Sequence, residues 1–169
     1  RIYQTAYFWT NVNPNRQGST NGTGSTYSGN AYAVYNGTGG VPATSETNTP
    51  VGFTPTAIIK VGQGFIVKAR PLQNDKTLIF SNTIRTTADT HFFSKGSASE
   101  KDRYWLKLTT PGLDVNTILI GYVPGATNNF EWDYDAPLLS VGSDSFYSLL
   151  NEDKLGIQGR TYPLNTQDI

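Results

Sequence analysis

The sequence has no cysteine and no methionine, and it contains a single histidine. Without cysteine, neither a disulfide bond nor a thiolate metal site can form, so the fold has to be stabilised by its core. At 169 residues the chain is long enough to bury one. Because methionine and a charged-then-apolar leader are both missing, we expect a processed product or a fragment of a longer protein.

Charge is also scarce. Charged residues make up 15% of the chain and the formal net charge is zero. A neutral chain lacks the basic face that binds nucleic acid or anionic lipid, so neither is expected as a partner. No apolar run approaches the roughly 20 residues that span a membrane as a helix, and we expect no membrane insertion.

Aromatic residues and glycine are plentiful: ten tyrosines, eight phenylalanines and 17 glycines are present. Tyrosine and threonine favour strands, while glycine and asparagine favour turns. Short apolar runs between turn residues predict strands at Ile2–Trp9, Ala31–Tyr35, Ala57–Val61, Gly64–Ala69, Thr77–Phe80, Arg103–Leu108, Thr117–Val123, Leu138–Val141, Phe146–Leu150 and Leu155–Gln158. Many short, evenly spaced strands are typical of a sandwich or barrel. We predict an all-β fold, an antiparallel β-sandwich that is jelly-roll-like.

The organisation along the chain predicts a single module over residues 1–169. Residues 11–55 are rich in turn-forming residues and are expected to be loop-rich, whereas 56–169 hold most of the strands. The large apolar residues of the predicted strands give the expected core: Phe8, Ile59, Phe65, Val67, Ile79, Phe80, Tyr104, Leu106, Ile118, Ile120 and Ile157.

Seven segments, in this order, carry a resemblance to a known group of proteins. They are AYFWTNVNP, AYAVYNGTGG, VGQGFIVKA, FSNTIRTTADTHFF, DRYWLKL, ILIGYVPGATNNFEWDYDA and FYSLLNEDKLGIQGRTYPL, and together they cover most of the chain. The ordered set resembles the β-rich region that precedes the C-terminal sorting domain in type IX-secreted proteins of Flavobacterium-like Bacteroidota. Such proteins also carry a Gly-Asn-Pro-Tyr type segment before the YFW strand and a sorting domain after the last stretch; neither occurs here.

The resemblance implies a cell-surface or extracellular protein, exported by the type IX machinery and either attached to the outer membrane or released. It implies a structural or interaction module of an adhesin or surface assembly and no enzyme. A sheet trimmed of neighbouring segments leaves an open edge strand, which pairs readily with another chain. We therefore expect protein partners, including copies of the chain itself.

Three carboxylates stand at alternate positions in NNFEWDYDAP: Glu131, Asp133 and Asp135. In a strand they would share one face and repel one another unless a cation intervened. Ca²⁺ takes several oxygen ligands, which Asn128 and Asn129 would supplement, so a calcium site is one reading. A solvated turn is the other.

The aromatic residues of interest are Tyr3, Tyr7, Trp9, Tyr27, Tyr32, Tyr35 and Trp132. Exposed on a sheet, aromatic rings stack on sugars, which makes a glycan-binding module the alternative function. Packing in the core is the favoured reading, because a sandwich needs bulky inward residues. Those nearest the polar segments, Tyr27, Tyr32, Tyr35 and Trp132, are the candidates for contact with a partner.

The remaining motifs indicate no catalytic centre. His91 would have to serve any Ser-His-Asp arrangement, yet its surroundings lack the glycines of a nucleophile elbow, so a hydrolase is the least favoured reading. Gly62 and Gly64 form a lone GxG, which favours a bulge or a close strand crossing. The tripeptides Asn21-Gly-Thr23 and Asn36-Gly-Thr38 fit a glycosylation acceptor and indicate exposed turns.

Overall fold

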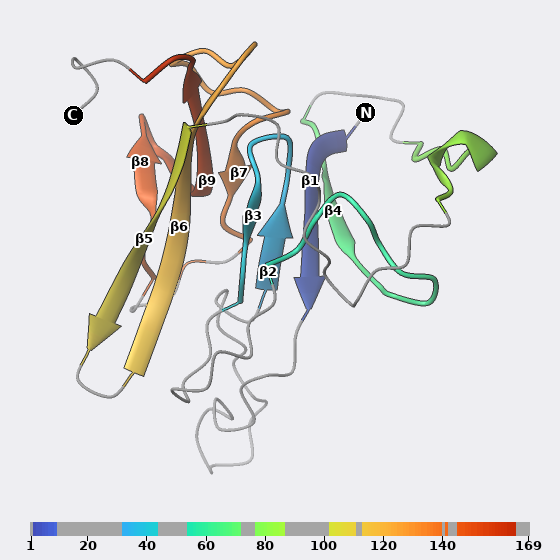
Figure 1. The fold of residues 1–169 in the computed structure, drawn as a ribbon, viewed down its shortest axis with the longest axis horizontal. Coiled ribbons are helices and arrows are strands. Elements are labelled where there is room, and N and C mark those ends of the chain that lie inside the picture. Colours follow the sequence, from blue (N-terminus) through green and yellow to red (C-terminus); the bar gives the residue numbers. More distant parts are fainter. Residues whose placement is uncertain are drawn as a thin grey trace.

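The computed structural model describes residues 2–9, 32–43, 54–71, 77–86, 102–110, 113–139, 141 and 145–164. Their elements are β1 (Ile2–Trp9), β2 (Tyr32–Tyr35), β3 (Gly40–Val41), β4 (Ile66–Ala69), a 3-10 turn (Asn82–Ile84), β5 (Asp102–Thr110), β6 (Leu113–Val123), β7 (Ala136–Pro137), β8 (Ser148–Leu150) and β9 (Asp153–Thr161). These ranges contain no α-helix, which confirms the all-β prediction (Figure 1). No helix within the described ranges is long and apolar enough to cross a membrane.

The first sheet has the strand order β3-β2-β1-β4, with every neighbouring pair antiparallel. Three strands that follow one another in the chain lie side by side, and the fourth returns next to the first. This is the spatial order of a Greek key, a motif found in most β-sandwiches. The predicted loop-rich region 11–55 supplies two of these strands, β2 and β3.

The second sheet has the order β5-β6-β9-β7, and β8 pairs with the first residues of β9. Most pairs are antiparallel, including the long β5–β6 pair. This agrees with the predicted antiparallel sandwich. One pair differs, because β6 and β9 run parallel, with Leu119 opposite Ile157. Parallel strands need a long connection, which residues 124–152 provide.

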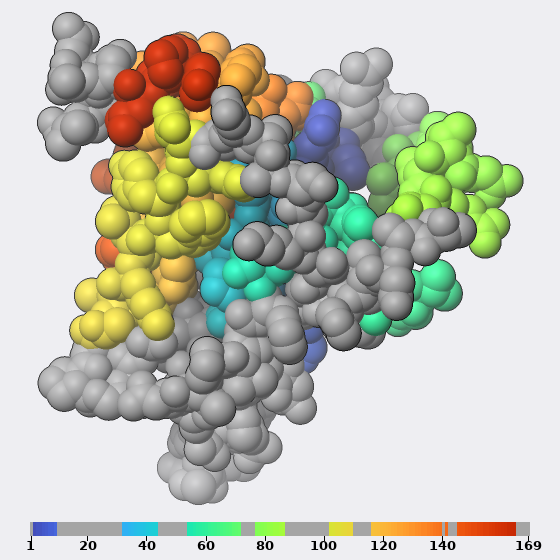
Figure 2. Space-filling view, viewed as in Figure 1, coloured from blue at the N-terminus to red at the C-terminus, as the bar shows by residue number. Residues whose placement is uncertain are grey.

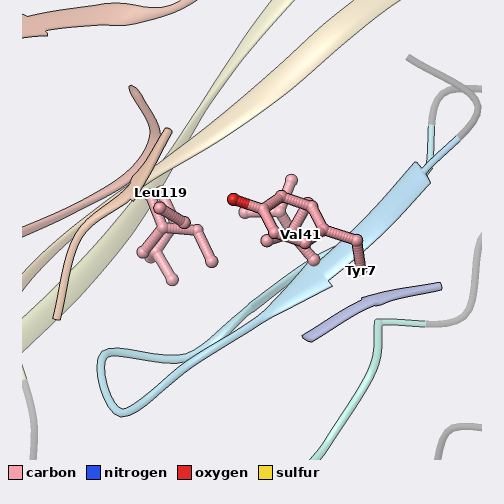
Figure 3. Packing of buried hydrophobic residues seen from close by; sticks show 6 residues of the cluster. Tyr7, Val41 and Leu119 are labelled. Carbon is pink, nitrogen blue, oxygen red and sulfur yellow. The ribbon is translucent and has the colours of Figure 1, made fainter. Parts of the chain in front are cut away.

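The main core lies between the two sheets (Figure 3). Its buried members come from both sheets: Tyr7, Val34, Val41, Leu119, Ala136 and Ile157. Because side chains alternate along a strand, the residue next to Tyr7 points to the other face of the first sheet. There, Phe8, Ala33 and Ala43 form a second, smaller cluster against which Phe65 packs.

Three predicted strands and part of the predicted core are wrong. Residues 57–61 and 77–80 form no strand. Of the strand predicted at 138–141, the described residues 138, 139 and 141 form none, and the nearest strand is Ala136–Pro137. Four predicted core residues are confirmed as buried: Phe8, Ile118, Ile120 and Ile157. Phe65 and Val67 are half-buried.

Five further residues predicted in the core are exposed: Ile59, Ile79, Phe80, Tyr104 and Leu106. Their apolar character identified them as core, but burial also requires a second layer. Ile59, Ile79 and Phe80 lie in peripheral segments that belong to neither sheet. Tyr104 and Leu106 lie on β5, at the edge of the second sheet. Sequence pattern shows which residues are apolar but not where the covering layer ends.

Candidate interaction surfaces

Residues 131–137, here called the bridging segment, join the two sheets. The backbone of β1 donates to this segment from Gln4 N to Trp132 O at 3.1 Å. The buried hydroxyl of Tyr7 donates to Pro137 O at 2.6 Å. Since Pro137 belongs to β7 in the second sheet, the bridging segment ties β1 to the opposite layer.

Asp135 is the buried charge of this segment, with no exposed surface. Its two carboxylate oxygens accept from different backbone donors, Glu131 N at 2.6 Å and Gly159 N at 2.9 Å. Burial raises the pKa of this carboxyl to about 6, although the two hydrogen bonds act in the opposite direction. The arrangement holds the bridging segment against β9.

The other two carboxylates of the predicted calcium site turn to separate partners. Glu131 Oε2 accepts from Thr127 N at 2.7 Å. Asp133 forms an ion pair with Arg70 at 2.9 Å. The three carboxylates therefore do not converge on a shared point, and no group of three His, Asp or Glu in the described part of the chain is placed to hold a metal ion. Each of the three carboxylates instead stabilises the fold through a hydrogen bond or an ion pair with another part of the chain.

The turn between β2 and β3 contributes two more buried polar residues, Asn36 and Thr38. Their side chains donate to Tyr134 O at 2.9 and 2.7 Å. Asn36 Oδ1 in turn accepts from Thr38 N at 2.9 Å. The tripeptide Asn36-Gly-Thr38 was expected in an exposed turn. It does form a turn, but its two polar side chains are buried and make hydrogen bonds inside the molecule.

The three candidate contact aromatics that the structure describes, Tyr32, Tyr35 and Trp132, pack in different places. Tyr32 and Tyr35 lie three residues apart on β2 and pack against the clusters on opposite faces of the first sheet. Trp132 packs edge-on against Tyr3, with ring centroids 4.4 Å apart, and under the Arg70 guanidinium. Tyr27 and His91 lie outside the described residues. Tyr3 and Tyr7 are buried, which confirms the favoured core reading for both.

Trp9, by contrast, is exposed at the end of β1. Its ring meets that of Tyr32 edge-on, with centroids 5.2 Å apart. Trp9 also lines a shallow groove together with Gln63, Phe65 and Ile66. The groove combines aromatic rings with an amide that can both donate and accept hydrogen bonds.

The outermost strand of the second sheet, β5, leaves apolar side chains exposed on both of its faces. Trp105 donates from Nε1 to Gly40 O at 3.0 Å, which directs its face of β5 toward the first sheet. On the other face, Tyr104, Leu106 and Leu108 are each exposed by two-fifths or slightly more. Figure 2 shows this strand, in yellow, as a continuous part of the visible surface.

The whole chain, residues 1–169, matches the family described as a domain of unknown function (DUF8693), and the protein belongs to that family. No curated protein and no solved structure matches it. The family description carries no activity, so a function has to be inferred from the residues of this chain.

Proposed function

We propose that this domain is a non-catalytic interaction module of an exported surface protein, and that it binds protein partners along the outer edge of β5. The observation that carries the proposal is the length and apolar character of that edge. An edge strand presents unpaired backbone groups, which bind an added strand from another chain.

The edges of the two sheets differ in how far they are protected. Natural edge strands are usually kept very short. In the described part of the chain, β3 and β7 have two residues each and β4 has four, whereas β5 has nine. Among these residues, β5 pairs only with β6. It is therefore the edge with most room for an added strand.

Two features limit the part of β5 that can pair. Lys107 places a charge on the strand, and the register with β6 shifts between Leu108 and Thr109. Charges and bulges both discourage edge pairing. The stretch from Tyr104 to Leu106 precedes both, so it is the expected centre of the contact.

A second copy of the chain is the simplest partner, and charge selects its register. Two antiparallel copies of β5 centred on Trp105 would place Arg103 opposite Lys107, and like charges directly opposite are destabilising. Centring on Leu106 instead places Trp105 opposite Lys107 and Tyr104 opposite Leu108. That register opposes no like charges, and it sets an aromatic ring beside a cation.

Disulfide trapping tests this register, because the chain has no cysteine of its own. In Leu106→Cys the two introduced thiols would face each other across the two-fold axis, with Cβ atoms about 5 Å apart. We expect mild oxidation to give a covalent dimer, detected by non-reducing electrophoresis. Leu149→Cys is the matched control, since Leu149 is exposed on β8.

Equal dimer yields from the two cysteine variants would contradict pairing through β5. A second measurement avoids the thiols: sedimentation velocity of the unmodified chain should show association that grows with concentration. Leu106→Lys should weaken that association at an unchanged melting temperature. A chain that stays monomeric at all concentrations would exclude a second copy as the partner.

The export route is part of the same proposal. It is supported by the seven ordered segments that resemble the region before a type IX sorting domain, which imply surface attachment or release. The encoded sequence that follows residue 169 provides the test. A sorting domain there is the expected result, and an unrelated cytoplasmic enzyme domain would contradict export.

Glycan binding is the second candidate, and the groove beside Trp9 favours it. Exposed aromatic rings stack on the apolar faces of sugars, while an amide such as that of Gln63 bonds hydroxyl groups. A glycan array should then show binding that Trp9→Ala abolishes and Trp105→Ala leaves intact. Absence of binding to any sugar would remove this candidate.

A further inference from the structure

A second cavity, here called the arm pocket, lies between two peripheral segments of the chain. It has a volume of about 630 Å³. Small-molecule sites typically measure about 300–1,000 Å³. One wall comes from 57–65 and the other from 80–86, and the lining includes Ile59, Lys60, Val61, Phe80, Ile84 and Arg85.

The walls of the arm pocket expose more apolar surface than a folded chain needs to. Phe80 is 64% exposed, Ile84 is 62% exposed and Val61 is wholly exposed. Single exposed apolar residues are ordinary, but several around one cavity mark a binding site. A ligand with an apolar body would cover this surface, and the removal of apolar surface from water would favour its binding.

The arm pocket is connected to the core and shaped by a tight turn. The Phe65 ring, which lines it, lies 6.4 Å from the Phe8 ring of the second core cluster and 6.3 Å from the Phe80 ring. At the far end of the same wall, Gln63 N donates to Lys60 O at 3.1 Å. Gly62 stands in that turn at φ +85°, a conformation that favours glycine. The pocket is therefore formed before a ligand arrives.

Arg85 places a cation beside the apolar walls of the arm pocket. Among the described residues that line the pocket, the ionisable side chains are Lys60 and Arg85. The Arg85 guanidinium complements a ligand whose apolar body ends in an anion, because a guanidinium binds a carboxylate in a fixed, bidentate geometry.

We infer that the arm pocket binds a small aliphatic carboxylate, with the chain of the ligand against Ile59, Phe80 and Ile84 and its carboxylate toward Arg85. This site is separate from the β5 edge, so it stands or falls independently of the proposed function. The occupant is a monomeric small molecule.

Isothermal titration calorimetry with three eight-carbon probes tests the inference. Octanoate, octanol and octylammonium share a tail and differ in the charge of the head. We expect saturable binding of octanoate, with octylammonium at least about tenfold weaker because its ammonium head is repelled by the Arg85 guanidinium. Equal affinities for the two charged probes would overturn the charge assignment, and absence of saturable octanoate binding would overturn the site.

Matched variants locate the binding. Arg85→Gln should weaken octanoate about tenfold and leave octanol unchanged, whereas Lys154→Gln, on β9, should change neither. Ile84→Ser should weaken both probes, and Leu149→Ser is its control for an exposed apolar residue. Because Ile84 and Arg85 lie on the surface of a peripheral segment, both variants should keep the melting temperature. Octanoate affinity unaffected by either variant would place the ligand elsewhere.

A membrane surface is the competing source of the same chemistry. Sedimentation with phosphatidylglycerol vesicles distinguishes it from a monomeric ligand. We expect no cosedimentation. Cosedimentation that Arg85→Gln abolishes, without binding of octanoate, would overturn the small-ligand inference in favour of a lipid surface.

Discussion

The bridging segment and the arm pocket differ in which side chains they bury. Between the sheets, Asp135, Asn36 and Thr38 are almost wholly buried although each is polar. At the periphery, Phe80 and Ile84 are mostly exposed although both are apolar. Polarity alone therefore does not decide the position of a side chain in this fold.

Hydrogen-bond partners explain why the polar residues between the sheets can be buried, and the end of the sheet layers explains why the apolar residues at the periphery are exposed. In the described part of the chain, no buried side-chain nitrogen or oxygen lacks a hydrogen-bond partner. A polar group can be buried when its partners are already in place. An apolar group is buried only where a second layer covers it, and the peripheral segments lie beyond both sheets. The predictions below test this difference.

The largest contrast should come from two phenylalanines. Phe8→Ala removes a ring from a closed core cluster and should lower the free energy of unfolding by about 4 kcal/mol. Phe80→Ala removes a ring that is mostly exposed and should lower it by about 0.5 kcal/mol or less. Urea denaturation measures both. Similar losses would mean that the arm pocket is part of the core.

Removing the carboxylate of Asp135 should have the next largest effect. Asp135→Ala leaves the partly buried N–H group of Glu131 and the buried N–H group of Gly159 without acceptors, which should lower the free energy of unfolding by about 3 kcal/mol. Asp133→Ala is the control. Its half-exposed ion pair with Arg70 should contribute about 0.5 kcal/mol. Equal losses would remove the structural role assigned to Asp135.

Close packing between Gly121 on β6 and Thr38 in the β2–β3 turn should be sensitive to a single added methyl group. A Cβ atom at Gly121 would collide with Thr38 and stand 3.2 Å from Arg103 Cγ, so Gly121→Ala should destabilise the fold by about 2 kcal/mol. Gly64 has no atom within 4 Å of its Cβ position, and Gly64→Ala should be neutral. Thermal melts of the two variants check this, and a neutral Gly121→Ala would show that the contact between Gly121 and Thr38 is less tightly packed.

The pH dependence should have the opposite sign to that of an ordinary ion-paired carboxylate. The pKa of Asp135 is about 6 in the folded chain against an ordinary value of 3.8, so the native state binds its proton more tightly than the unfolded state. Its contribution to stability is present below pH 3.8 and is lost as the pH rises through about 6. Carboxyl NMR of Asp135 should titrate with a midpoint near 6, and a midpoint below 4 would contradict the effect of burial.

The strands with clear alternation were predictable. In β1, Tyr3, Thr5 and Tyr7 share the buried face, as a period of two requires. The strands at β5 and β6 were also predicted, because both runs are rich in apolar residues, although their pairing was not. What the residues do locally was therefore readable from their spacing.

What depends on distant partners was not predictable. The parallel pairing of β6 with β9 is set by tertiary contacts that no local pattern encodes. The three alternating carboxylates were read as either a calcium site or a solvated turn, and neither reading anticipated the burial of Asp135. The partner of Asp133 and one of the two partners of Asp135 come from residues 63 and 24 positions away, which no local pattern encodes.

The bridging segment also bears on how the chain reaches its folded state. Its hydrogen bonds to β1 and to the β2–β3 turn join residues 96 to 130 positions apart in sequence. Contacts this distant slow folding, because the entropy of closing a long loop is lost before the contact forms. Asp135 obtains its second donor only from β9, so a nascent chain leaves the first sheet without its opposing layer until nearly the whole domain has been synthesised.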